Sequence, residues 1–250
     1  MSLAWLTPDW PAPARVRALS TTRAGGVSGG VYASLNLGDH VGDEPVAVAA
    51  NRRLLREAAR LPAEPYWLRQ VHGITVADLD AAPAAASLPA EADASLARTP
   101  GRICAILTAD CVPVLFAAAD GSAVAAAHAG WRGLAAGVLA ATVQALDIEP
   151  GALVAWIGPC IGAAAYEVGA EVREALLAAD PGAAGAFQDS RPGHWLADLP
   201  LLARRRLERL GIRSIHGGSD CTHRDGKRYF SHRRDGQTGR QATLVWLTDR

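Results

Sequence analysis

Two histidines and one cysteine stand where the sequence suggests that strands end or turn, and their side chains suit a metal ion. His72 lies in a polar turn between two short apolar runs, Cys111 lies at the break between two longer runs, and His128 closes an apolar stretch just before Gly130. Two imidazoles and one thiolate leave the fourth position of a tetrahedral zinc site open, which is how catalytic zinc is held. The three positions follow no local spacing rule, so the prediction rests on residue type and location.

The same residues also allow interpretations without a metal. A lone cysteine beside Val112 is usually a small buried hydrophobe, and a lone histidine at the end of an apolar strand is usually hydrogen-bonded in the core. Cys111 could also be a nucleophile activated by His128, as in cysteine hydrolases. The adjacent Asp110 could orient a ligand or move a proton.

An anion site could follow His128. If a helix begins near Trp131, its free backbone N–H groups point back toward His128, and Gly130 lets a ligand approach closely. Arg132 in the first turn could add a fork of donors for phosphate. The alternative is that Trp131 packs in the core and that Arg132 is solvated.

Three further residues are candidates for substrate contact. Arg23 and Asn36 lie in a loop at residues 23–42 that is rich in Gly, Ser and Asn, and long ordered loops are often functional. Arg233 belongs to the segment 231–235, which could bind phosphate. A structural or solvated turn is the alternative in each case.

Composition limits the classes of function. The chain has 250 residues, is 50% hydrophobic and balances 25 basic against 25 acidic residues, so we expect one domain over residues 1–250 and neither nucleic acid nor membrane as partner. Arginines gather at 202–240, where a basic patch could serve a phosphorylated small molecule. Four cysteines are too few for a disulfide scaffold, and no signal peptide or membrane span is seen. We expect a cytoplasmic protein, either a monomer or a small homo-oligomer.

The expected elements mix strands with helices. Apolar runs predict strands at 103–107, 112–118, 123–127 and 154–157, and Asp120-Gly121 predicts a hairpin between the second and third. Helices are expected at 43–60, 131–146, 168–179 and 198–210, and an Ala- and Pro-rich connection at 81–92. The predicted fold is mixed α/β (α+β), with layered mixed sheets flanked by helices.

At these positions the sequence resembles a known family over nearly its whole length. This is the YfiH/YlmD family, also called the multicopper polyphenol oxidoreductase or laccase-domain family. The matching segments, in chain order, are Thr22-Arg23-Ala24-Gly25-Gly26-Val27-Ser28, Ser34-Leu35-Asn36-Leu37-Gly38, Val41-Gly42-Asp43, Asn51-Arg52, Gln70-Val71-His72-Gly73, Thr108-Ala109-Asp110-Cys111-Val112-Pro113, Ala127-His128-Ala129-Gly130-Trp131-Arg132-Gly133, Ile157-Gly158-Pro159-Cys160-Ile161, Tyr166-Glu167-Val168, Phe230-Ser231 to Arg234, and Thr238-Gly239-Arg240-Gln241.

The resemblance implies a function as well as a site. It places the family's zinc ligands on His72, Cys111 and His128, and implies a fold similar to that of a deamidating bacterial toxin. It implies phosphorolysis of adenosine, inosine and methylthioadenosine, together with adenosine deamination. Copper-dependent oxidation of phenols and editing of peptidoglycan precursors by a Cys/His hydrolase are the alternatives attached to the family. The chain departs from its relatives at residues 162–165 and 223–224, away from the three ligand positions.

Overall fold

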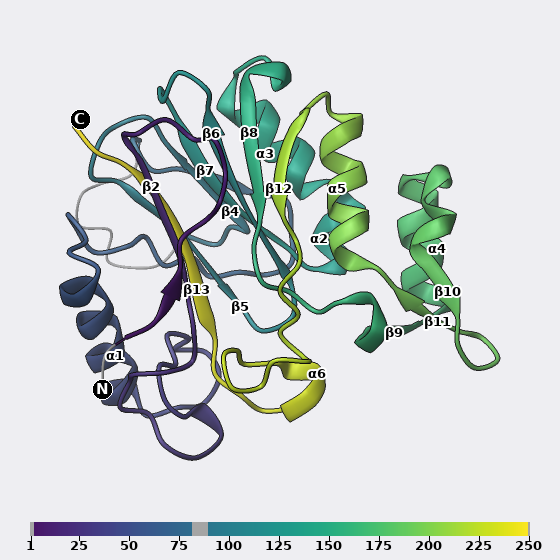
Figure 1. Ribbon diagram of the computed structural model, residues 1–250, viewed down its shortest axis with the longest axis horizontal. Coiled ribbons are helices and arrows are strands. Elements are labelled where there is room, and N and C mark those ends of the chain that lie inside the picture. The colour runs from purple at the N-terminus through teal and green to yellow at the C-terminus, as the bar shows by residue number, and fades with distance from the viewer. Residues whose placement is uncertain (1–2, 82–89, 250) are drawn as a thin grey trace.

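A six-stranded mixed sheet forms the centre of the computed structural model, which describes residues 3–81 and 90–249 (Figure 1). Its strand order is β12-β8-β6-β7-β4-β3. In that order the strands are Ser214–Gly217, Leu153–Ile157, Val112–Ala118, Val124–Ala129, Ala94–Ala97 and Val76–Asp78. β6 pairs antiparallel with β7 and β8, whereas β12 runs parallel to β8 and β3 parallel to β4. The mixed sheet and the hairpin at Asp120-Gly121 were both predicted from the sequence, and the structure confirms them.

A four-stranded sheet packs against one face of the central sheet. Its strands, in the order β1-β2-β13-β5, are Trp5–Leu6, Val16–Thr21, Gln241–Leu247 and Ile103–Thr108. In β6, Leu115 and Ala117 face this second sheet, while Val114 and Phe116 face the helices on the other side. Because β6 is buried on both faces, it reads as a continuous apolar run without polar alternation.

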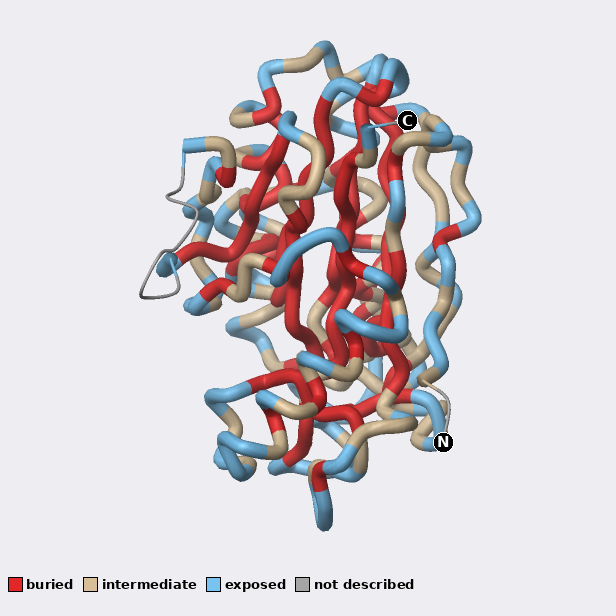
Figure 2. The backbone as a smooth tube through the Cα atoms, turned by 90° about the vertical axis from the view of Figure 1, so that its left-hand side faces the viewer, coloured by how far each residue is buried: buried red, intermediate tan, exposed pale blue. Residues whose placement is uncertain are grey.

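Helices cover both outer faces, which gives four layers. α2 (Trp131–Ala136), α3 (Val138–Leu146) and α5 (Leu199–Arg209) pack on the central sheet, and α1 (Pro45–Ala58) packs on the four-stranded sheet. Figure 2 shows the strands buried between more exposed loops and helices. The layered α/β fold was therefore correctly predicted.

A small sheet and two further helices complete the fold. The strands β10 (Phe187–Asp189), β11 (His194–Ala197) and β9 (Glu167–Gly169) pair antiparallel. α4 (Ala170–Ala179) follows β9 directly, and α6 (His232–Asp235) precedes β13. Among the described residues, no helix has both the length and the apolar composition needed to span a bilayer.

Two predicted helices differ from the structure. The helix expected at 131–146 is divided at Gly137, whose φ of 101° is left-handed and therefore suits a residue without Cβ. The helix expected from residue 168 begins at Ala170, because Val168 pairs with Trp195 of β11. Of the connection expected at 81–92, residues 82–89 lie outside the described part of the chain.

Candidate metal centre

Neighbouring strand ends bring the three predicted metal ligands together at one edge of the central sheet. Cys111 directly precedes β6, and His128 lies near the end of β7, where Pro113 is its antiparallel partner. His72 comes from the loop before β3. The ligand atoms of the three side chains all lie within 4.8 Å of one another, and Cys111 Sγ lies 3.9 Å from His72 Nε2.

The donor set fits a single zinc ion. Ligands of tetrahedral zinc are separated by about 3.3–3.6 Å, given Zn–N and Zn–S bonds of about 2.0 and 2.3 Å. The observed separations, all within 4.8 Å, exceed these values by at most about 1.5 Å, a difference that small side-chain rotations can close. His128 is buried, Cys111 is half-buried and His72 is exposed, so an ion held here would have one side open to a ligand.

The buried carboxylate of Asp93 orients two of these ligands. Its Oδ1 lies 2.8 Å from His128 Nδ1 and accepts the N–H of His72 at 2.9 Å, and its Oδ2 accepts the N–H groups of Val71 and Gly73. Because the carboxylate accepts, Nδ1 carries a proton, so the proton that leaves when a metal binds is the one on Nε2, whose lone pair the metal needs. Asp93 is held next to β7 by the bond from His128 N to its carbonyl, 2.7 Å long.

The thiol and the imidazole reinforce each other's charge. Burial raises the pKa of the Cys111 thiol, but His128 and His72 outweigh it and lower this pKa from 9.0 to about 6. Burial lowers the pKa of His128, but Cys111 and Asp93 outweigh it and raise this pKa from 6.5 to about 9. Before a metal binds, Cys111 and His128 therefore form a thiolate–imidazolium pair at neutral pH, and binding must release the His128 proton.

The backbone at the site has an unusual conformation at two residues and a close approach of side chains at a third. His72 and Asp110 have φ values of 62° and 91°, in the left-handed region that residues with a Cβ rarely adopt. A Cβ on Gly130 would lie 2.8 Å from His72 Cδ2 and 3.1 Å from Cys111 Sγ. The site thus depends on a glycine where two ligands approach the backbone.

Hydrogen bonds to Asp110 fix the loop that carries Cys111. Its carboxylate accepts the hydroxyl of Thr222 at 2.6 Å and the N–H of Arg233 at 2.7 Å, and its carbonyl accepts Ile161 N–H. Both carboxylate oxygens are therefore occupied by the protein itself. This arrangement supports a positioning role in place of the proton-carrying role considered from the sequence.

A cavity of about 200 Å³ opens beside the three ligands. It is lined by His72, Ala109, Asp110, Cys111, Trp131, Arg132, Ile161, Tyr166, Leu199, His232 and Arg233. The Arg132 guanidinium lies 4.3 Å from the Trp131 ring, and that of Arg233 lies 5.0 Å from the Tyr166 ring. The cavity thus combines two exposed cations with two aromatic rings and a few apolar side chains.

The other two predicted substrate-binding residues lie outside this lining. Arg23 donates to the carbonyls of Ala33 and Gly226, and its guanidinium lies 4.5 Å from the ring of Phe230. Asn36 is fully buried, and its amide bonds the backbone of Gly38 as well as Asp43 and Arg240 N–H. Both side chains hold the loop at 23–42 in place.

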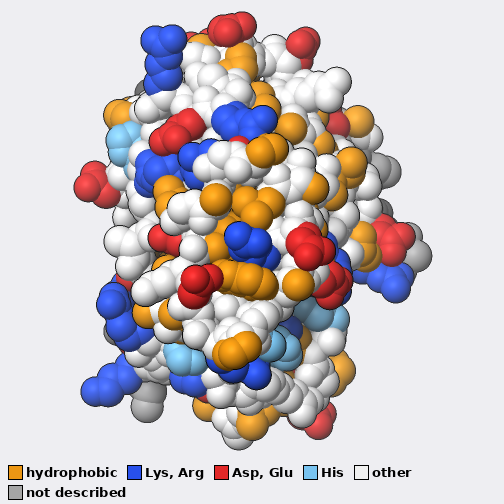
Figure 3. All heavy atoms as spheres, turned by 90° about the vertical axis from the view of Figure 1, so that its right-hand side faces the viewer, with side chains coloured by type: hydrophobic (Ala, Val, Ile, Leu, Met, Phe, Trp, Pro, Cys, Tyr) orange, Lys and Arg blue, Asp and Glu red, His pale blue; other side chains and the backbone are white. Residues whose placement is uncertain are grey.

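The arginines of α5 do not form an open basic patch. Arg205 and Arg209 pair with the buried carboxylate of Asp180, while Arg204 and Arg206 donate to backbone carbonyls. Figure 3 shows basic side chains on this side of the molecule spread among acidic and apolar ones. Within the basic patch expected at 202–240, the arginines of α5 are therefore engaged in internal contacts, whereas Arg233 reaches the cavity.

Cys160 and Cys221 occupy structural positions outside the cavity lining. They face each other across an isolated parallel β-bridge, and Cys221 Sγ accepts the N–H of Gly162 at 3.2 Å. All four cysteines are free thiols. Cys111 is thus the one cysteine among the cavity-lining residues.

Comparisons with known proteins place the chain in a family context. The family model described as "Multi-copper polyphenol oxidoreductase laccase" matches residues 17–248. A Pseudomonas aeruginosa protein named purine nucleoside phosphorylase is 55% identical over 247 residues, which cover 98% of this chain and 99% of that protein. The Escherichia coli purine nucleoside phosphorylase YfiH is 50% identical over 242 residues, which cover 97% and 98%. The resemblance inferred from the motifs is confirmed.

Solved structures agree with this assignment. A crystal structure of a Neisseria meningitidis protein matches with a TM-score of 0.93 at 49% identity, and the match covers 98% of this chain and 99% of that one. At this level of identity and coverage, the similarity extends to the arrangement of the layers.

Replacing Gly130 by alanine should disrupt metal binding. The new methyl group would overlap His72 Cδ2 and crowd Cys111 Sγ, so the ligands must separate. Gly169→Ala is a matched control, because a Cβ there meets no atom within 4 Å. Zinc content after gel filtration measures the effect. Equal zinc content in the two variants would contradict the proposed close approach of the ligands to Gly130.

Asp93→Asn should weaken zinc binding by about 10–100-fold, the usual cost of losing such a supporting carboxylate. An amide –NH₂ facing His128 Nδ1 favours the tautomer with the proton on Nε2. The Nε2 lone pair is then no longer available to bind the metal. Competition with a chromophoric chelator measures the affinity. Asp180→Asn, a buried carboxylate outside the cavity lining, controls for general loss of stability and should keep the wild-type affinity.

Alkylation should reveal the low pKa of Cys111 once a chelator has removed any metal. Iodoacetamide reacts with the thiolate, so the rate at Cys111 should rise with pH and reach half its maximum near pH 6. An ordinary cysteine titrates near about 8.5. Mass spectrometry of the Cys111 peptide gives the rate, and added zinc should protect it. A midpoint above pH 8 would rule out the ion pair with His128.

Proposed function

The chain belongs to the multi-copper polyphenol oxidoreductase laccase family, and from this premise we propose that it is a zinc-dependent purine nucleoside phosphorylase. The observation that carries the proposal is the convergence of His72, Cys111 and His128 beside a cavity that holds two cations and two aromatic rings. Such a cavity offers contacts for a phosphate and a purine at the same time.

His72, Cys111 and His128 would hold the zinc ion. When bound, zinc supplies a Lewis acid that stabilises negative charge on an oxygen at its open position. The buried Asp93 keeps the His128 ring in the ligating tautomer, and Gly130 leaves room for the ligands to approach. These residues would hold the ion beside the cavity.

Arg132 and Arg233 are the proposed phosphate-binding residues. Both are exposed and both line the cavity beside Cys111. Arg233 is fixed by its backbone bond to Asp110 and by the donation of Nη1 to Glu167 O at 2.7 Å, which leaves other guanidinium donors free. Guanidinium groups match phosphate oxygens with paired hydrogen bonds, so the two arginines would orient phosphate for attack on the ribose anomeric carbon.

The purine would lie between apolar and aromatic side chains. Trp131 and Tyr166 offer ring faces, and Ile161 and Leu199 offer apolar contact. When the bond from the anomeric carbon to the purine nitrogen breaks, the departing base takes up a proton. His232 lines the cavity and donates Nδ1–H to Gly236 O at 2.8 Å, so its Nε2 is available to hold or deliver that proton.

The proposed substrates are adenosine, inosine and methylthioadenosine, with phosphate as the second substrate. We also propose adenosine deaminase activity at the same site, because the exposed side of His72 gives water access to the metal ligands. The free thiols accord with a cytoplasmic location. A copper-dependent polyphenol oxidase and a Cys/His hydrolase that edits peptidoglycan precursors are the alternatives; stoichiometric copper with phenol oxidation, or hydrolysis of a muropeptide, would favour them.

A single assay tests the proposal. Purified protein is incubated with adenosine, with and without phosphate, and the products are separated by chromatography. Phosphate-dependent adenine reports phosphorolysis, and phosphate-independent inosine reports deamination. Cys111→Ser should lower adenine formation by about 100-fold or more, because the thiolate ligand is lost, whereas Cys221→Ser should not. Adenine formation that is unchanged in Cys111→Ser would refute the role of the metal centre.

A further inference from the structure

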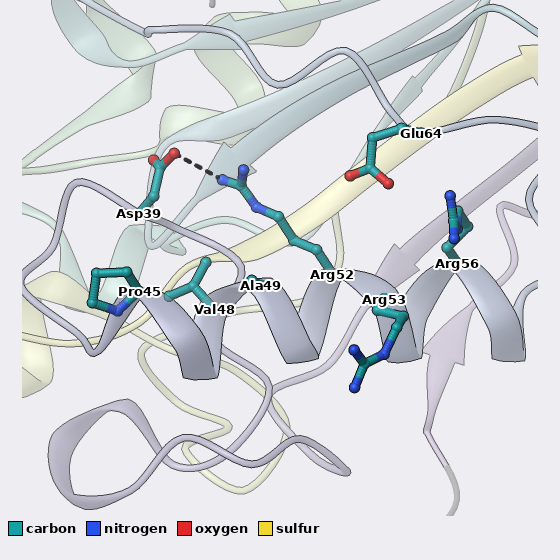
Figure 4. Close-up of a pocket in the computed structure, with 8 residues that line it drawn as sticks. All are labelled: Asp39, Pro45, Val48, Ala49, Arg52, Arg53, Arg56 and Glu64. Carbon is teal, nitrogen blue, oxygen red and sulfur yellow. Dashed lines mark ion pairs between the residues drawn. The ribbon is translucent and has the colours of Figure 1, made fainter.

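A second cavity lies along α1 and shares no lining residue with the metal centre. Its volume is about 440 Å³, and it is lined by Asp39, Pro45, Val48, Ala49, Arg52, Arg53, Arg56 and Glu64. Most of these residues come from one face of α1, and Figure 4 shows the acids Asp39 and Glu64 approaching that face from the neighbouring loops. The cavity thus brings charges of both signs together.

Arg52 is a pre-positioned cation in this cavity. Its Nε and Nη2 donate to Leu37 O at 3.0 and 2.9 Å, and its guanidinium lies 4.5 Å from the Trp67 ring. Its side chain is only 17% exposed, and burial lowers its pKa. The Nη1 group has no partner among the described residues. A fixed, partly desolvated guanidinium with a free edge binds an oxyanion at little cost in side-chain entropy.

Arg56 supplies a second cation one helical turn further on. Its side chain makes no ion pair or hydrogen bond within the described part of the chain, and Figure 4 shows it rising from α1 on the same side as Arg52, whereas Arg53 points away. Like charges four residues apart on a helix destabilise it slightly. Arg56 lies in the last turn of α1, where its charge complements the helix dipole, and the pair leaves guanidinium donors directed at the cavity.

Two carboxylates face these cations. Asp39 lies 3.3 Å from Arg52 Nη2 and is itself half exposed. Glu64 accepts Trp67 Nε1–H at 2.8 Å through Oε1, and its second oxygen remains available. Carboxylates repel an inorganic anion, but they accept hydrogen bonds from hydroxyl groups. The arrangement therefore suits a ligand that carries an oxyanion and hydroxyls at separate ends.

We propose that this cavity binds the phosphate monoester of a sugar or similar polyol. The phosphate lies against Arg52 and Arg56, where paired N–H groups match its oxygens, and the hydroxyls donate to Glu64 and Asp39. The site needs neither the metal nor the cavity beside it, so its occupancy is independent of the proposed phosphorylase activity.

Calorimetric titration with ribose 5-phosphate tests this proposal. The full-length protein carries Arg132→Gln and Arg233→Gln, so that cations at the metal centre do not contribute to binding. We expect saturable binding that weakens by about tenfold or more in Arg56→Gln, as charged hydrogen bonds are lost. Arg60→Gln, an exposed arginine beyond the end of α1 and outside the cavity lining, should bind as before.

The Glu64→Gln variant separates sugar phosphate from inorganic phosphate. Glutamine can still accept the Trp67 N–H bond, but it removes a negative charge from the cavity. Inorganic phosphate should then bind more tightly, because repulsion is relieved, whereas the preference for ribose 5-phosphate over phosphate should fall. Ribose alone should not bind measurably in any variant.

Three results would overturn the proposal. Equal affinity of Arg56→Gln and Arg60→Gln would show that the α1 cavity does not hold the phosphate. Equal affinity of the unaltered cavity for ribose 5-phosphate and inorganic phosphate would remove the role of the hydroxyls. If Glu64→Gln kept the full preference for ribose 5-phosphate over inorganic phosphate, Glu64 would not have the role assigned to it. None of these results depends on whether the metal centre is active.

Discussion

The carboxylate of Asp93 is the interaction on which the candidate metal centre depends. It accepts three consecutive backbone N–H groups from the His72 loop and bonds the ring of His128. A loop and a strand that are distant in sequence are thereby fixed to one buried anion. Burial raises the pKa of this carboxyl, but the bonds from His128 and the backbone outweigh it and lower the pKa, so Asp93 remains charged at neutral pH.

The layered fold explains why such a site can exist at the edge of the central sheet. β6, β7 and β4 are neighbours, and their antiparallel register sets the residue before β6, the end of β7 and the residue before β4 side by side. These positions hold Cys111, His128 and Asp93. Rigid strands buried on both faces thus supply much of the positioning: His128 lies within β7, Cys111 and Asp93 directly precede β6 and β4, and His72 comes from a longer loop.

Several features could be predicted from the sequence because they depend on local patterns. Long apolar runs identified β5, β6 and β7, and the helix expected at 198–210 corresponds to α5, where the Asp198 side chain accepts Leu201 N–H. The ligand triad followed from residue type and strand ends, supported by the family motifs. The strand β2 was missed, because Val16–Thr21 mixes an arginine with small polar residues and lacks a strong apolar run.

The remaining errors concern tertiary contacts. Asp93 follows an Ala- and Pro-rich connection and looks like an ordinary loop acid until β4 places it beside β7. The same holds for Tyr166 and His232, which reach the cavity from separate loops. The arginines of α5 suggested an exposed patch because their partner, Asp180, lies in a different segment. Side chains whose roles depend on distant partners cannot be interpreted from local sequence alone.

The bonds from Asp93 hold His72 and His128 in position with no ion in place. Folding of the chain therefore does not require a metal to bind first. In zinc fingers the ion drives the chain to fold, but here the large hydrophobic layers do so and the ligands are already gathered. Binding strength among divalent transition ions follows a general order that favours copper over zinc. The ion taken up by the proposed centre would therefore depend on which metals are supplied where the protein folds, as well as on the geometry and type of its ligands.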